Sequence, residues 1–321
     1  MHGLRRQDSE LEDRPSAASR AEWVLVDISL RLLRLLSPEP RLGVDEDGLP
    51  VVDYGRRFGT MIGRKRNPTT IAIVGLKAIN SASLVGLPEF DKTGDEILSL
   101  VSVERMARWL FDSSVDRKEY MVFHIGFRFP SYFLVPPWKS CLSEGFGGMF
   151  LVTYGTANLN RRYVECGIEH LRSLLVPVSE GGLRSNDSGC FLECSGYDAR
   201  KRWPIILNGH LYCLVTLFNA WKMLGIPEFG VAFKQAVSQL EILLPTFEGP
   251  FFSYYDDYGN PAKLFYHRVH IHLLKKLFEF SNASYLRATA ERWEAMLPKY
   301  NFTLALLMRV YTMRIPYLPR R

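Results

Sequence analysis

A run of aromatic and acidic residues near position 255, followed by a tyrosine and two histidines, holds the side chains best suited to acid–base chemistry. Residues 251–258 read Phe-Phe-Ser-Tyr-Tyr-Asp-Asp-Tyr, a Gly-Asn-Pro turn follows, and Tyr266 and His267 open a helix that also carries His270. An extended run, a tight turn and a helix start bring several ionisable groups to one rim. We therefore expect the chemistry of this protein at that rim.

Each of these side chains also has a structural interpretation. Tyr255 and Tyr266 could be half-buried rings whose hydroxyl groups are hydrogen-bonded. His267 and His270 lie three residues apart at a helix start and could bind zinc. The sequence offers no identifiable third ligand, so packing or substrate contact is the preferred interpretation for both histidines.

Four blocks of sequence, in order along the chain, resemble the D-glucuronyl C5-epimerases of heparan-type polysaccharide synthesis. Tyr255-Asp256 with Tyr266-His267-x-x-His270-Ile looks like the closing motif of that family. The other blocks are residues 137–145 (Pro-Trp-Lys-Ser-Cys-Leu-Ser-Glu-Gly), 191–193 (Phe-Leu-Glu) running on to 207–209 (Leu-Asn-Gly), and a weaker match at 47–50 with 67–68. The resemblance covers residues 40–297 and is far more specific than any single block.

The resemblance implies a metal-independent and cofactor-free enzyme that converts D-glucuronosyl to L-iduronosyl residues in a heparosan-like polysaccharide. Glu193 and Tyr266 match the two opposed acid/base positions of the family, and Tyr255 matches a further essential tyrosine. The resemblance also implies a homodimer. Substrate contacts are expected from Trp138, Lys139, Glu144, Tyr197, Arg200, Arg202, Asn208, His267 and His270.

Inversion at C5 of a uronate needs two acid/base groups on opposite faces of the sugar. The C5 proton lies next to a carboxylate and is a very weak acid, so its removal creates charge that must be stabilised on the carboxylate oxygens. One group removes the proton and another delivers one from the other side. Because tyrosine has an unperturbed pKa of about 10, a tyrosinate held by neighbouring cations would be a stronger base than a carboxylate.

The chain departs from the family pattern beside the matched glutamate. The family usually has glutamine where Glu144 stands, and a tyrosine directly after its glutamate, whereas Cys194 follows Glu193 here. Tyr197 could replace that tyrosine only if the loop is rebuilt.

Two alternatives to the epimerase function therefore stay open. One is a uronate-specific polysaccharide lyase, which starts with the same proton abstraction but expels the C4 substituent, and the other is a catalytically inactive carbohydrate-binding relative.

A pattern of paired helices repeats from residue 120 onward. Each unit has an aromatic extended segment, a hinge, a helix, a tight turn and a second amphipathic helix. The pattern predicts a mainly α fold, an (α/α) toroid or partial barrel of helical hairpins, with short β-hairpin or extended segments lining a cleft. The expected helices are 21–36, 69–81, 104–111, 142–154, 161–175, 208–224, 228–244, 266–280 and 284–297, with a turn at 45–50 and a strand at 51–54.

The composition indicates a globular protein, because 47% of its 321 residues are hydrophobic and 13% aromatic, which is ample for a core. We divide the chain into a flexible tail (1–20), a helical and short-strand part (21–120), the catalytic core (121–297) and a C-terminal helix with a basic tail (298–321). Neither a signal peptide nor an apolar run of about twenty residues is recognisable. This predicts a soluble protein of the cytoplasm, or one that acts at the cytoplasmic membrane surface.

The charge and the cysteines narrow the choice of partner and compartment. A net charge of +6 and a pI near 9.0 suit an anionic partner, and without a nucleic-acid motif an acidic polysaccharide is preferred over nucleic acid. The five cysteines are expected to be buried free thiols in a reducing compartment. Cys190 and Cys194 could pair or hold a metal, but no second pair has ligand spacing. The acidic cluster 45–47 lacks the spacing of a calcium loop.

Overall fold

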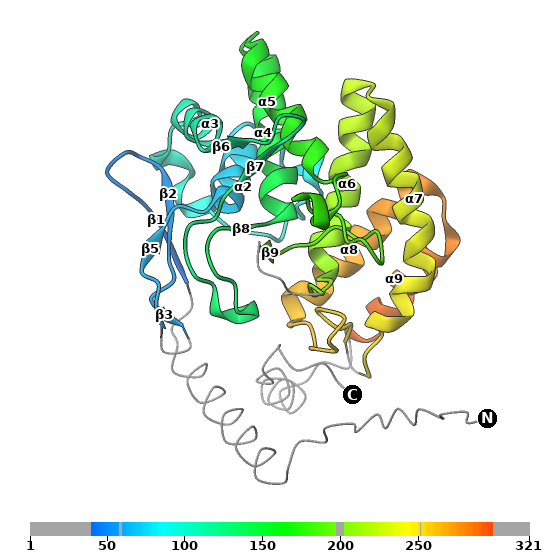
Figure 1. Ribbon diagram of the computed structural model, residues 1–321. Coiled ribbons are helices and arrows are strands. Elements are labelled where there is room, and N and C mark those ends of the chain that lie inside the picture. The colour runs from blue at the N-terminus through cyan, green and yellow to red at the C-terminus, as the bar shows by residue number, and fades with distance from the viewer. Residues whose placement is uncertain (1–39, 58–59, 197–201, 251, 298–321) are drawn as a thin grey trace, which may run out of the picture.

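The computed structural model describes residues 40–57, 60–196, 202–250 and 252–297. In these ranges, helical hairpins succeed one another around the molecule, from blue-green to orange in Figure 1. They are α2 (Pro68–Ala78) with α3 (Val103–Asp112), α4 (Cys141–Ala157) with α5 (Arg161–Ser173), α6 (Leu207–Leu224) with α7 (Pro227–Leu243), and α8 (Leu264–Ser281) with α9 (Ser284–Glu294). Helix α2 packs on α4, α4 on α6 and α6 on α8, so these four inner helices form an arc. The fold is a mainly α, partial (α/α) barrel, as the sequence predicts.

Helix α6 lies in the interior of the protein, and its burial explains this position. The first eleven residues of α6, 207–217, are all buried, and a helix that is hydrophobic all round belongs inside a protein. Helix α5 is amphipathic instead, and it crosses α4 very closely. A Cβ atom added at Gly148 would lie 2.8 Å from the Gly167 carbonyl oxygen, so only glycine permits this approach.

The strands are short and lie between the helices or at the edge of the molecule (Figure 1). The strand β2 lies between β1 and β5 in an antiparallel sheet, with Leu42 opposite Val52. Before β2, the Asp45 carboxylate accepts the N–H groups of Asp47 and Leu49 and closes the expected turn. The strands are β1 (Arg41–Val44), β2 (Pro50–Asp53), β3 (Arg56–Arg57), β4 (Thr60–Met61), β5 (Arg64–Lys65), β6 (Ser114–Asp116), β7 (Met121–Phe123), β8 (Trp138–Lys139) and β9 (Ser195–Gly196).

Short 3₁₀ helices connect several of these elements. They span Ala82–Val85, Asp95–Leu100, Pro130–Tyr132, Val178–Glu180 and Leu244–Phe247. The first of them packs on α6, and its Leu84 carbonyl accepts a hydrogen bond from the Asn219 side chain at 2.8 Å. The segment after α2 therefore lies against α6 in the described part of the chain.

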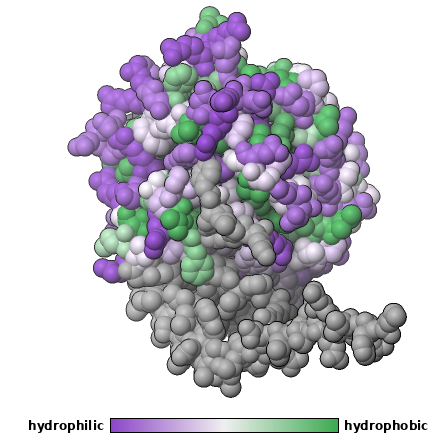
Figure 2. Space-filling model, in the orientation of Figure 1, coloured by the Kyte–Doolittle hydropathy of each residue, from purple (hydrophilic) through white to green (hydrophobic). Residues whose placement is uncertain are grey.

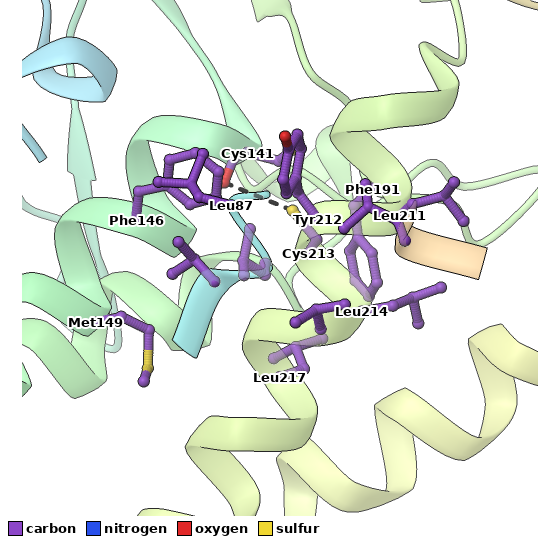
Figure 3. Close-up of a cluster of buried hydrophobic side chains, with 14 of the residues drawn as sticks. Leu87, Cys141, Phe146, Met149, Phe191, Leu211, Tyr212, Cys213, Leu214 and Leu217 are labelled. Carbon is purple, nitrogen blue, oxygen red and sulfur yellow. Dashed lines mark hydrogen bonds between the residues drawn. The ribbon is translucent and has the colours of Figure 1, made fainter. Parts of the chain in front are cut away.

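The main hydrophobic core lies where α4 meets α6 (Figure 3). Phe146 of α4 packs edge-on against Tyr212 of α6, with 5.3 Å between the ring centroids. The Cys213 thiol donates to the Cys141 carbonyl oxygen at 3.6 Å, the contact drawn as a dashed line in Figure 3. All five cysteines are free and buried, as the sequence predicts.

The expected helices within the described ranges are confirmed, with ends that differ by at most a few residues. The helix expected at 21–36 and both predicted tails lie outside the described residues. In the view of Figure 2, hydrophilic side chains cover much of the described surface, with apolar ones scattered among them. Within the ranges described, every helix is too short or too polar to cross a membrane.

Candidate active site

A cavity of about 360 Å³ opens where the inner helices begin. The N-cap residues of α2, α4, α6 and α8 all line it, namely Asn67, Ser140, Ile206 and Lys263. The first turn of a helix carries a partial positive charge, because its N–H groups have no partner within the helix. Four helix starts and a lysine at one cavity therefore favour an anionic ligand.

The wall of the cavity combines aromatic rings with polar groups. Trp138, Phe129 and Tyr54 line it together with Thr69 and Thr70 of α2. The Trp138 indole N–H donates to the Phe127 carbonyl oxygen at 2.7 Å, which fixes the orientation of the ring. Aromatic faces beside hydroxyl groups suit a sugar, which presents both apolar C–H faces and polar edges.

The two residues that match the acid/base positions of the family meet in this cavity, together with the further tyrosine. Glu193, Tyr255 and Tyr266 all line it. The Tyr255 hydroxyl donates to the Glu193 Oε1 atom at 3.3 Å, although the two residues are 62 positions apart in the sequence. The rings of Tyr255 and Tyr266 contact each other, with 4.9 Å between their centroids. A titratable carboxyl group and two phenols therefore face the same space.

A recurring buried hydrogen bond holds the extended segments on the inner helices. In α4, α6 and α8, the fourth residue of the helix accepts a backbone N–H from the segment that precedes it in the chain. The pairs are Phe123 N–H to Glu144 Oε1 at 2.8 Å, Phe191 N–H to His210 Nδ1 at 3.1 Å, and Ser253 N–H to His267 Nδ1 at 3.0 Å. We call these three contacts the helix pins. Two of the pinned segments carry Glu193 and Tyr255, so the pins help to position the site.

Glu193 lies directly on the first turn of α6. A Cβ atom added at Gly209 would come within 2.7 Å of the Glu193 side chain, so glycine is required for this approach. Burial raises the pKa of Glu193 to about 7, although Tyr255, Asn208 and the Gly209 N–H act in the opposite direction. Its Oε2 atom is buried and makes no hydrogen bond within the described structure. This carboxyl group can therefore gain or lose a proton near neutral pH.

Tyr255 behaves as a neutral hydrogen-bond donor. Burial, and then the nearby charge of Glu193, raise the pKa of Tyr255 well above its usual value. The tyrosinate that we considered from the sequence is therefore disfavoured at this position, because a negative neighbour opposes its ionisation. The ring instead supports Glu193 through its hydroxyl group.

Asp256 organises the loop that carries Tyr255, a role that our sequence interpretation missed. Its carboxylate accepts hydrogen bonds from the Tyr132 hydroxyl at 2.8 Å and from the Asn260 side chain at 2.8 Å. Burial raises the pKa of Asp256 to about 6. A signal was available, since an aspartate four residues before the asparagine of a Gly-Asn-Pro turn commonly bonds the backbone of that turn.

Some of the expected substrate-binding residues lie at or beside the cavity, and others lie away from it. Trp138 lines the cavity, and Asn208 is buried beside Glu193. Lys139 does not line the cavity; it is fully buried, it donates to the Gly181 carbonyl oxygen at 2.5 Å, and burial lowers its pKa to about 8. Arg202 is exposed and pairs with Asp257. Tyr197 and Arg200 lie outside the described residues.

Glu144, His267 and His270 lie in the core, and this corrects our expectation that they contact substrate. The Glu144 Oε2 atom lies 2.5 Å from His170 Nδ1, with both side chains fully buried. Burial opposes the protonation of His170, but Glu144 raises the pKa of His170 to about 9, so the two form a buried ion pair. His267 and His270 both contact the Ser253 hydroxyl, and burial lowers the pKa of each. Their partners are other core groups.

Comparison with known proteins identifies the family of the chain. Residues 116–295 match the sequence profile of the family described as D-glucuronyl C5-epimerase C-terminus. The chain belongs to this family. The matched range contains Glu193, Tyr255 and Tyr266, together with the helix pins.

Individual relatives are distant. The chain is 26% identical over 182 residues to the D-glucuronyl C5-epimerase of Caenorhabditis elegans, an alignment that covers 50% of this chain and 29% of that protein. It is 24% identical over 174 residues to an uncharacterised protein of Methanocaldococcus jannaschii, covering 53% and 56% of the two chains. The alignments thus span less than two thirds of either relative.

Similar solved structures include an α-mannanase of glycoside hydrolase family 76 from Bacteroides thetaiotaomicron and a D-mannose isomerase. The α-mannanase is 11% identical, with a TM-score of 0.49 and coverage of 91% of this chain and 78% of its own. The isomerase is 10% identical, with a TM-score of 0.45 and coverage of 87% and 70%.

Proposed function

We propose that the protein is an epimerase that inverts C5 of D-glucuronosyl to L-iduronosyl residues within an acidic, heparosan-like polysaccharide. The observation that carries this proposal is the meeting of Glu193, Tyr255 and Tyr266 in one cavity at the starts of the inner helices. Membership of the D-glucuronyl C5-epimerase C-terminus family supports the choice of reaction. The net charge of +6 is compatible with a polyanionic substrate.

The cavity offers distinct partners for the two sides of a uronate. In our proposal the carboxylate of the sugar lies toward the helix N-termini and Lys263, where positive charge is available. The apolar face of the ring packs on aromatic side chains such as Trp138. This orientation matters for catalysis, because the charge that forms when C5 loses its proton spreads onto the same carboxylate oxygens.

Proton transfer then needs only groups that the chain supplies. The ionised Glu193 takes the C5 proton, and the electron pair of the broken C–H bond moves into the sugar carboxylate. Tyr266 delivers the proton of its hydroxyl group to the opposite face of C5, which forms the inverted centre. Exchange with water returns both side chains to their starting forms, and the reverse reaction exchanges their roles. Tyr255 holds the Glu193 carboxylate in place.

The proposal is tested by proton NMR of heparosan and N-sulfated heparosan incubated with the protein in deuterium oxide. We expect deuterium at C5 together with iduronate signals, and loss of both in Tyr266→Phe. Tyr163→Phe is the matched control, because Tyr163 packs against Phe111 and Tyr154, outside the cavity lining. The rate of deuterium exchange at C5 with Tyr163→Phe should equal that with the unmodified protein.

Other results would contradict the proposal. An unsaturated uronate product would identify a lyase, and binding without exchange at C5 would indicate a carbohydrate-binding protein without epimerase activity. Absence of exchange on both polymers would exclude them as substrates. The homodimer implied by the family resemblance remains a prediction, which sedimentation velocity tests directly.

A further inference from the structure

A continuous series of aromatic rings leads from the cavity to the surface. Tyr255 contacts Tyr266 with 4.9 Å between ring centroids, Tyr266 contacts Phe265 at 5.3 Å, and Phe265 contacts Phe90 at 6.0 Å. The first two rings line the cavity. Phe265 and Phe90 are each 40% exposed. The series therefore connects the proposed reacting position with an exposed aromatic pair.

This exposed pair is held in place by its surroundings. Phe265 is the second residue of α8, and Phe90 meets it nearly perpendicularly, with an interplanar angle of 86°. Phe90 also contacts His272, two turns further along α8. Next to Phe90, the buried Asp91 is tied to α2 through its carbonyl oxygen, which accepts a hydrogen bond from Lys77 at 2.6 Å. Two exposed rings fixed in this way form a preformed platform.

Charged residues of both signs lie near the platform: Glu89, next to Phe90, is exposed, and cations lie near Phe265. Lys263, which lines the cavity, lies two residues before Phe265, and Arg268 lies three residues after it and is exposed. Side chains three residues apart lie on the same face of a helix. Arg268 therefore lies on the same face of α8 as Phe265, where a carboxylate of an acidic polysaccharide would pass.

We propose that Phe265 and Phe90 form a subsite for the sugar ring adjacent to the uronate held in the cavity. The ring of this neighbouring unit stacks on the exposed face of Phe265, and Phe90 supports the edge of that side chain. This inference rests on the proposed function, because it assumes that a uronate within a longer chain occupies the cavity. The rings are continuous from the cavity lining to the surface, and this continuity supports the subsite.

The experiment compares ligands of two lengths by isothermal titration calorimetry. A heparosan disaccharide can occupy only the cavity, whereas an octasaccharide also reaches the platform. We expect Phe265→Ala to weaken octasaccharide binding about 5- to 10-fold, the loss typical of one stacking contact, and to leave disaccharide affinity unchanged. Phe265→Trp should restore the affinity for the octasaccharide. Ile242→Ala is the control, since Ile242 is an exposed apolar residue on α7.

The outcomes separate the subsite from the proposed reaction. Unchanged octasaccharide affinity in Phe265→Ala, or equal weakening of both ligands, overturns the subsite. Length-dependent weakening without any C5 deuterium exchange by the unmodified protein supports the subsite and disproves the epimerase. Failure of the unmodified protein to bind either oligosaccharide overturns both proposals.

Discussion

Replacement of Glu193 by glutamine should make the protein more stable at neutral and alkaline pH while it abolishes C5 exchange. Burial raises the pKa of Glu193 from 4.5 to about 7. A difference of this size, at 1.36 kcal/mol per pKa unit, corresponds to a cost on the order of 3 kcal/mol when the folded protein must ionise the group. Glutamine has nearly the same shape but carries no charge, so the variant avoids this cost.

The sign of the effect depends on pH in a defined way. Below pH 4.5 the carboxyl group is protonated in both the folded and the unfolded chain, so Glu193→Gln should change the unfolding free energy little. Between pH 4.5 and 7 the unfolded chain ionises first, and the unmodified protein loses stability relative to the variant. Above pH 7 the difference should reach its full value, on the order of 3 kcal/mol.

The assay is urea unfolding of both proteins at a series of pH values from 5 to 8.5. Asp256 also titrates in this range, since its pKa is raised to about 6. Because Asp256 is present in both proteins, its contribution largely cancels when their unfolding free energies are subtracted. The control is Glu96→Gln, because Glu96 is an exposed carboxylate and its replacement should not reproduce the stabilisation expected of Glu193→Gln. A variant that is equally or less stable than the unmodified protein at pH 8.5 would refute the reasoning.

Three further substitutions test the remaining parts of the site. Gly209→Ala places a Cβ atom 2.7 Å from the Glu193 side chain and should lower the C5 exchange rate about 100-fold, because Glu193 is displaced. The control is Gly43→Ala, whose added Cβ atom would enter open space and should leave the exchange rate unchanged. Tyr255→Phe removes a hydrogen bond that lowers the Glu193 pKa, so the midpoint of the pH–rate profile should move upward by about one unit; an unmoved midpoint contradicts this coupling. Glu144→Gln breaks a buried ion pair and should lower the unfolding free energy by about 3 kcal/mol, measured by urea unfolding, without changing KM.

The sequence was sufficient to predict the helical hairpins because their signals are local. The pattern of apolar residues gives each helix its extent, and residues that favour a positive φ angle mark the ends. Gly225 ends α6 and Asn282 ends α8, both in the left-handed region, and Pro227 starts α7. These signals depend on nearby residues, so they can be read without knowledge of the tertiary structure.

The assignment of polar residues at the helix starts was less successful, for a geometric reason. Successive residues of an α-helix are rotated by about 100°, so neighbours in sequence face different surroundings. At the start of α8, the N-cap Lys263 and Tyr266 line the cavity, whereas His267 is buried and accepts the Ser253 N–H. At the start of α4, the N-cap Ser140 and Leu142 line it, whereas Glu144 does not. The residue type alone does not reveal which direction faces the cavity.

The close approach of Glu193 to Tyr255 and Gly209 also had no signal in the chain. The two acid/base residues and the second tyrosine entered through a resemblance to known enzymes, and the distances between them depend on how three hairpins pack. Glu193 and Tyr255 come from segments 62 residues apart. Contacts of this separation are determined by the tertiary fold, which periodicity and composition do not specify.

The helix pins have a consequence for which insertions and deletions the chain can tolerate. Glu193 lies two residues after the pinned Phe191, and Tyr255 lies two residues after the pinned Ser253. One extra residue in either interval would shift Glu193 or Tyr255 relative to its pin and so move its side chain from its place in the cavity. Length changes in homologues should therefore accumulate beyond these short intervals. The equivalent position after the third pin is Ile125, a buried apolar residue, so two of the three pinned segments deliver a polar group to the cavity and the third does not.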